Sequence, residues 1–66
     1  MYVDGYVVWH KLKSADNGYK ITVYAMDIET GRVYQRHHVV KDYNEDLITF
    51  LMLDFTDELG VSGYAG

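Results

Sequence analysis

The 66-residue sequence contains neither cysteine nor proline. Without cysteine, no disulfide bond and no thiolate metal site can supplement the hydrophobic core. A domain of this size buries only about 60% of the surface that its unfolded chain exposes, so its stability margin is small. Small domains without such links often gain stability by oligomerising or by docking on a partner. The absence of cysteine therefore gives a first argument for an interaction protein.

Long apolar segments are also missing from the sequence. No run approaches the roughly 20 apolar residues that a membrane-spanning helix requires. Residues 1–5 lack the basic and apolar regions of a secretory signal. Hydrophobic residues nevertheless make up 48% of the chain, which is too many for a disordered protein. We therefore expect a soluble, cytoplasmic protein without a membrane segment.

Basic side chains are absent from residues 42–66, which carry six acidic residues and hence a charge of −6. Residues 1–41 carry six basic and four acidic residues, a net charge of +2. The total of −4 is therefore unevenly placed, and the molecule is electrically polar.

The first part of the chain is rich in β-branched and aromatic residues, the composition of β-strands. Three strands are predicted, over residues 6–13, 19–28 and 32–41. Asn17 and Gly18 suit positive φ in the first connection. Gly31 suits the left-handed position of a three-residue loop in the second. The pattern predicts an antiparallel meander with the second strand in the middle.

An amphipathic helix is predicted after the strands. Asp42 is a candidate N-cap residue, and Glu45 follows at the spacing of a capping box. Apolar residues then recur at intervals of three and four, as on one face of a helix: Leu47, Ile48, Leu51, Met52, Phe55 and Leu59. Gly60 is expected to end the helix. The sequence thus predicts an α+β domain over residues 1–60, a three-stranded antiparallel β-meander with one C-terminal amphipathic helix packed on one face (βββα), and a flexible tail over residues 61–66.

The tyrosines direct attention to the face of the sheet that the helix leaves open, since the chain has seven tyrosines but only two phenylalanines. If Trp9 lies opposite Val23 and Ile21 opposite Val39, the core face holds Val7, Trp9, Ile21, Val23, Ala25, Val33, His37 and Val39. The open face then gathers residue types that are enriched at protein interfaces: Tyr6, Tyr24, Met26, Tyr34 and Arg36. A shift of one residue in register would exchange the two faces.

The predicted helix offers a second candidate surface on its side away from the core. Phe50 and Leu53 fall there among three acidic residues, Asp46, Asp54 and Asp57. An apolar pair ringed by carboxylates is typical of a docking site for a basic partner. Scattered exposed apolar residues are also common on ordinary surfaces, and the acids could simply form a solvated helix face.

Residues suited to catalysis or metal binding are few. The serines, Ser14 and Ser62, fall in a turn and in the tail, away from any histidine–carboxylate pair. His37 and His38 are adjacent on a strand, so they point to opposite faces and cannot share an ion. Zinc needs three or four ligands. We therefore expect no enzyme, no cofactor and no metal.

Three functions remain open. The leading hypothesis is a small acidic protein-binding module that regulates or antagonises a larger protein with a basic groove. Its acidic helix would imitate a nucleic-acid backbone. Small acidic antagonists encoded by phages and mobile elements are similar in size and charge. The first alternative is single-stranded nucleic-acid binding by stacking on the sheet tyrosines, which the net negative charge opposes. The second alternative is a structural subunit of a larger assembly. We also expect a homodimer.

Overall fold

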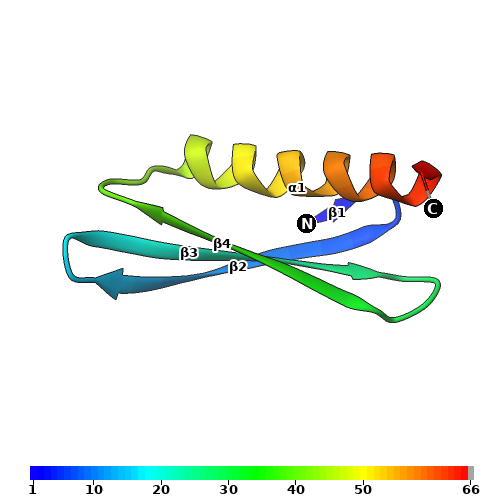
Figure 1. The fold of residues 1–66 in the computed structure, drawn as a ribbon, viewed down its shortest axis with the longest axis horizontal. Coiled ribbons are helices and arrows are strands. Elements are labelled where there is room, and N and C mark those ends of the chain that lie inside the picture. The colour runs from blue at the N-terminus through cyan, green and yellow to red at the C-terminus, as the bar shows by residue number, and fades with distance from the viewer. Residues whose placement is uncertain (66) are drawn as a thin grey trace.

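The computed structural model describes residues 1–65, and for residues 61–65 only the course of the backbone. Its elements are β1 (Tyr2–Val3), β2 (Tyr6–Ala15), β3 (Gly18–Asp27), β4 (Val33–Val40) and α1 (Glu45–Ala65). The strands form one antiparallel sheet in the order β1-β2-β3-β4, and α1 lies along one of its faces (Figure 1). The predicted α+β fold is confirmed, but the sheet has four strands, not three.

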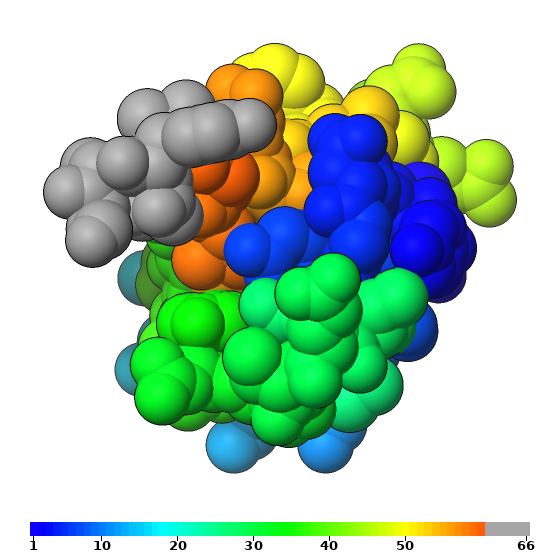
Figure 2. All heavy atoms as spheres, turned by 90° about the vertical axis from the view of Figure 1, so that its right-hand side faces the viewer, coloured from blue at the N-terminus to red at the C-terminus, as the bar shows by residue number. Residues whose placement is uncertain are grey.

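The additional strand, β1, forms a hairpin with the start of β2. Asp4 and Gly5 at its tip have φ values of 49° and 89°, and a two-residue type I′ turn requires positive φ at both positions. The Met1 nitrogen donates to the Val8 carbonyl at 2.9 Å, and the Val8 N–H donates to the Met1 carbonyl at 2.6 Å. In Figure 2 this hairpin (blue) lies between α1 (yellow to orange) and the β3–β4 connection (green).

The loop between β2 and β3 is shorter than predicted: the predicted strand ends leave five residues, 14–18, and the predicted register, with Trp9 opposite Val23, implies three. Ala15 pairs with Gly18, so only two residues remain in the loop. Neither Asn17 nor Gly18 has the predicted positive φ. Gly18 is needed for a different reason: a Cβ atom there would overlap the carbonyl oxygen of Val40. The β3 and β4 backbones therefore approach closely at this end of the sheet.

The loop between β3 and β4 is one residue longer than predicted. The Asp27 N–H donates to the Arg32 carbonyl at 2.9 Å, and the Gly31 N–H donates to the Asp27 carbonyl at 2.7 Å. The Asp27 carboxylate accepts the N–H of Glu29 at 2.9 Å, a side-chain turn that starts the loop at Asp27. Gly31 has a φ of 76°, so its predicted left-handed conformation is confirmed.

These loop lengths shift both registers by one residue, so that Trp9 faces Tyr24 and Ile21 faces His38. The flanking strands therefore turn the opposite faces to α1 from those predicted, whereas β3 keeps its predicted face. The buried core consists of Val8, Ile21, Val23 and Ala25 from the sheet with Met52 and Phe55 from α1. Residues predicted for the core lie instead on the open face: Val7, Trp9, Val33, His37 and Val39.

The helix begins with Asn44 as its N-cap, not Asp42. The Asn44 side-chain oxygen accepts the N–H of Leu47 at 2.8 Å, and its carbonyl accepts the N–H of Ile48 at 3.2 Å. An asparagine that bonds the N–H three residues ahead is a standard cap. The predicted apolar stripe does face the sheet, since Met52 and Phe55 are buried there.

The end of the helix also differs from the prediction. Helix α1 continues past Gly60 to Ala65, so Gly60 is an interior helical residue. The side chains of residues 61–65 and the whole of residue 66 lie outside what the structure describes. The predicted flexibility of residues 61–66 therefore stays a prediction. Within the described part of the chain, no helix has the length and apolar character that crossing a membrane demands.

Candidate functional site

The side of α1 that faces away from the sheet carries an exposed acidic stripe, which we define as Asp46, Phe50, Leu53, Asp54 and Asp57. Their spacings of three and four residues place them along one helix face. All of them are exposed, with 63% of Phe50 and 44% of Leu53 accessible to solvent. The structure therefore brings together every helix residue that the sequence nominated for docking.

The carboxylates of the acidic stripe have no basic neighbour that neutralises them. Among residues 1–60, whose side chains are described, the one ion pair joins Glu58 to Arg36 of β4. That contact accounts for Glu58, although an acid near a helix C-terminus opposes the helix dipole. It leaves Asp46, Asp54 and Asp57 as unpaired charges around Phe50 and Leu53.

The residues predicted for a tyrosine surface do not share one face. Tyr24 and Met26 lie on the open face, whereas Tyr6, Tyr34 and Arg36 lie on the face that α1 covers. Tyr6 and Tyr34 are half-buried and pack against the core. The register shift separates the set, and a role of each residue in binding stays a prediction.

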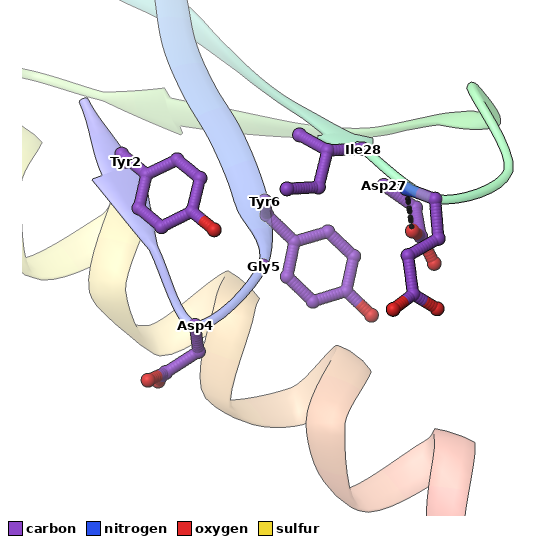
Figure 3. Close-up of a pocket in the computed structure, with 7 residues that line it drawn as sticks. Tyr2, Asp4, Gly5, Tyr6, Asp27 and Ile28 are labelled. Carbon is purple, nitrogen blue, oxygen red and sulfur yellow. Dashed lines mark hydrogen bonds between the residues drawn. The ribbon is translucent and has the colours of Figure 1, made fainter.

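Partial burial raises the pKa of the Tyr6 phenol, and the nearby Asp27 and Tyr34 raise this pKa further. Tyr6 lies in a pocket of about 260 Å³ between the β1–β2 turn and the β3–β4 loop. Figure 3 shows Tyr2 and Tyr6 on one side of this pocket and Asp27 and Ile28 on the other. In the described residues, no group of three or more histidine or acidic side chains is placed to hold a metal ion. The pocket is thus best understood as the junction of two turns.

The open face of the sheet is aromatic at its centre. The Trp9 and Tyr24 rings stack with centroids 5.3 Å apart and planes 8° from parallel. The Lys11 ammonium lies 5.7 Å from the centroid of the Tyr24 ring. Across the next pair of strands, the Thr22 hydroxyl and the His37 Nδ1 atom are 2.9 Å apart in a hydrogen bond. Sequence reasoning missed Trp9 as a surface residue, because it placed this side chain in the core.

The same face carries a lysine cluster, which we define as Lys11, Lys13 and Lys20. Lys13 lies directly opposite Lys20, and like charges in that position destabilise a sheet. The alternation of side chains leaves no carboxylate on the strand residues of this face. The lysines also contained the missing signal: Trp9 shares its face with Lys11 and Lys13, and lysine side chains are almost never buried in a core.

The candidate site therefore consists of two surfaces on opposite sides of a two-layer molecule. One is the acidic stripe of α1, and the other is the aromatic and lysine-bearing open face of the sheet. No described residue set has the arrangement of a metal centre. No family model, no curated protein and no solved structure matches this chain.

Proposed function

We propose that this chain is a small protein-binding module, a regulator or antagonist that docks the acidic stripe of α1 into a basic groove of a larger protein. The observation that carries the proposal is the exposure of Phe50, 63% accessible among carboxylates without basic partners. When a partner covers a large exposed aromatic side chain, the burial of its apolar surface favours binding. The adjacent charges restrict that partner to one with a positive surface.

The stripe has the spacing of a helix that binds in a groove. Such helices insert anchors separated by three, four or seven residues into an apolar cleft, and Phe50 and Leu53 have this separation. Burial of the part of each anchor that is still exposed contributes about 1–2 kcal/mol. Asp46, Asp54 and Asp57 flank the anchors and would meet lysine or arginine side chains at the rim. A groove that binds nucleic acid has the required charge, so mimicry of a phosphate backbone is one form of this function.

The helix presents the stripe in a fixed geometry before it binds. Met52 and Phe55 on the opposite side of α1 are buried against the sheet, and Asn44 caps the N-terminus. A surface that is already ordered loses little conformational entropy on association. This favours docking by the folded domain over docking by an isolated helical peptide of the same sequence.

A second candidate, single-stranded nucleic-acid binding, is favoured by the lysine cluster beside the Trp9–Tyr24 stack. The acidic stripe lies on the other side of a molecule whose shortest dimension is 18 Å, and the Debye length at physiological salt is about 8 Å. The net negative charge therefore opposes this function less than the sequence alone implies. However, Trp9 and Tyr24 stack on each other and Lys11 lies over the Tyr24 ring, so fewer ring faces remain for bases.

Affinity capture from an extract of the native host tests the leading proposal. Wild-type protein should retain a discrete partner that Phe50→Ser and the double variant Asp54→Lys/Asp57→Lys fail to retain. The matched control on the open face, Val39→Ser, changes a residue that is 77% exposed and should retain the same partner. Retention by all helix variants, with loss in Val39→Ser, would reject the acidic stripe as the docking surface.

The nucleic-acid alternative has its own readout, because Trp9 is the only tryptophan in the chain. An oligothymidylate that stacks on the open face should quench Trp9 fluorescence, with steep salt dependence. Lys11→Glu/Lys13→Glu should abolish the quenching, and Phe50→Ser should leave it intact. Quenching of that kind, together with no protein captured through α1, would replace the leading proposal with the second.

A further inference from the structure

One edge of the sheet is only partly covered. β1 covers only the start of β2, where it pairs with Tyr6 and Val7. The last backbone contact on that side joins Met1 to Val8. Within residues 1–65 no strand lies beside β2 beyond that point. Alternate residues of a strand direct both backbone groups to the same side. The N–H and C=O groups of His10, Leu12 and Ser14 therefore point to the vacant edge, in line with those of Val8.

A groove of about 560 Å³ lies beside this edge, between β2 and the N-terminal half of α1. It is lined by Met1, His10, Leu12, Tyr43, Glu45, Ile48, Thr49 and Met52. Leu12 points to the helix side of the sheet, yet it remains 39% exposed because no described strand pairs with β2 opposite Leu12 on that side. The vacant backbone groups and the apolar groove thus adjoin each other along the same strand.

The outward side chains of the vacant edge are basic. Lys11 and Lys13 alternate with the residues that face the groove, and Lys20 lies opposite Lys13 on β3. Pairing of two copies through their β2 edges would set lysine against lysine, which is unfavourable in a sheet. The homodimer expected from the sequence therefore gains no support at this edge. A strand that brings carboxylates would neutralise the cluster.

We propose that β2 binds an extended peptide segment of a partner protein by strand addition. The segment pairs antiparallel to β2 and lies in line with β1. The segment alternates apolar residues, whose side chains enter the groove, with acidic residues on the outer face. Backbone hydrogen bonds to His10, Leu12 and Ser14 give affinity, and the alternate side chains give specificity. This site is separate from the acidic stripe of α1 and goes beyond the function proposed above.

The register of the added strand defines the recognised pattern. The residue opposite Leu12 is apolar and enters the groove toward Ile48 and Met52. The residues opposite Lys11 and Lys13 are acidic and lie on the outer face. The shortest recognised segment is therefore an acidic, an apolar and an acidic residue in that order. Replacement of its acidic residues by basic ones should weaken binding most.

A defined peptide tests this proposal with the intact chain. The probe is a capped heptapeptide that alternates valine with glutamate, and its matched control carries lysine in place of glutamate. On addition of the glutamate peptide, the amide signals of His10, Leu12 and Ser14 should shift and their hydrogen exchange should slow. The glutamate peptide should bind about tenfold more tightly than the lysine peptide at low salt. The variant Lys11→Glu/Lys13→Glu should reverse that preference.

Two further measurements separate strand addition from charge attraction alone. A glutamate peptide with N-methylated amides on the edge-facing residues keeps its charge but loses its donors, so it should bind at least about tenfold more weakly. Equal binding by the methylated peptide, or no binding at millimolar peptide, would overturn the proposal. Phe50→Ser should bind the glutamate peptide like wild type, so failure at the β2 edge and failure of the acidic stripe are distinguishable.

Discussion

The Arg36 guanidinium carbon lies 4.9 Å from the centroid of the Phe55 ring. This contact joins β4 to α1, and the same guanidinium pairs with Glu58. We expect Arg36→Ala to lower the free energy of unfolding by about 1–2 kcal/mol, because it removes both the cation–π contact and the packing of the arginine stem. Glu58→Gln should cost less, about 0.2–1 kcal/mol, since only an exposed ion pair is lost. Urea denaturation of both variants checks the order, and an equal loss in the two would contradict it.

Two glycine substitutions should have opposite effects on stability. Gly18→Ala should destabilise the fold by about 1–3 kcal/mol, because the new methyl group meets the Val40 carbonyl and forces β3 and β4 apart. Gly60→Ala adds a methyl group in the interior of a helix, where no described atom outside the neighbouring helix backbone lies within 4 Å, and should stabilise by about 0.8–1 kcal/mol. Thermal unfolding compares the two variants. Destabilisation by Gly60→Ala would indicate that the helix ends there after all.

The two candidate N-caps can be distinguished by alanine substitution. Asn44→Ala removes the acceptor of the Leu47 N–H and should lower the free energy of unfolding by about 1 kcal/mol. Asp42→Ala, at the position that the sequence pattern favoured, should change it by less than about 0.5 kcal/mol. Chemical denaturation monitored by circular dichroism measures both changes. The reverse order would place the cap at Asp42.

The raised pKa of Tyr6 predicts a loss of stability in alkali. Burial, and then Asp27 and Tyr34, raise the pKa of the folded phenol, so the folded chain holds this proton more tightly than the unfolded chain. The free energy of unfolding should therefore fall as the pH rises above about 10, the ordinary tyrosine value. Tyr6→Phe cannot ionise and should show a flatter decline. Unfolding curves collected from pH 9 upward test this, and identical slopes for the two proteins would refute it.

The helix surface could be predicted from the sequence because helical periodicity is a local property. Residues three and four positions apart meet on one face whatever the rest of the chain does. The spacing of Phe50 and Leu53 relative to Met52 and Phe55 was therefore sufficient to place one pair outside and the other inside. The cap was misplaced by two residues because Asp42 and Asn44 are both good cap formers, and only the backbone path selects between them.

The sheet surface could not be predicted in the same way, because its register depends on the loops. Tyr24 pairs with Gln35, and Tyr34 pairs with Ala25, so the two tyrosines project from opposite faces. That outcome follows from the Asp27 side-chain turn, which lengthens one loop by a residue. A change of one residue reverses the face of a whole strand, so an error in loop length becomes an error in the site.

Two signals in the sequence could have predicted the strand β1 and the face of β2 that is open to solvent. Asp4-Gly5 between apolar residues is a strong mark of a two-residue hairpin, and it encodes β1. Lys11 and Lys13 share their face with Trp9, which assigns that face to solvent. The groove beside β2 had no comparable signal, because it depends on how β2 and α1 pack in three dimensions.

A photo-crosslinker on the acidic stripe tests the central claim most directly. We would replace Phe50 with benzoylphenylalanine in the native host and, in a parallel strain, replace Val39 on the open face. Irradiation should join the position 50 protein to one discrete larger protein with a basic surface, and Asp54→Lys/Asp57→Lys should abolish this product. The position 39 protein should give no such product. A discrete product at position 39 with none at position 50 would contradict docking through α1.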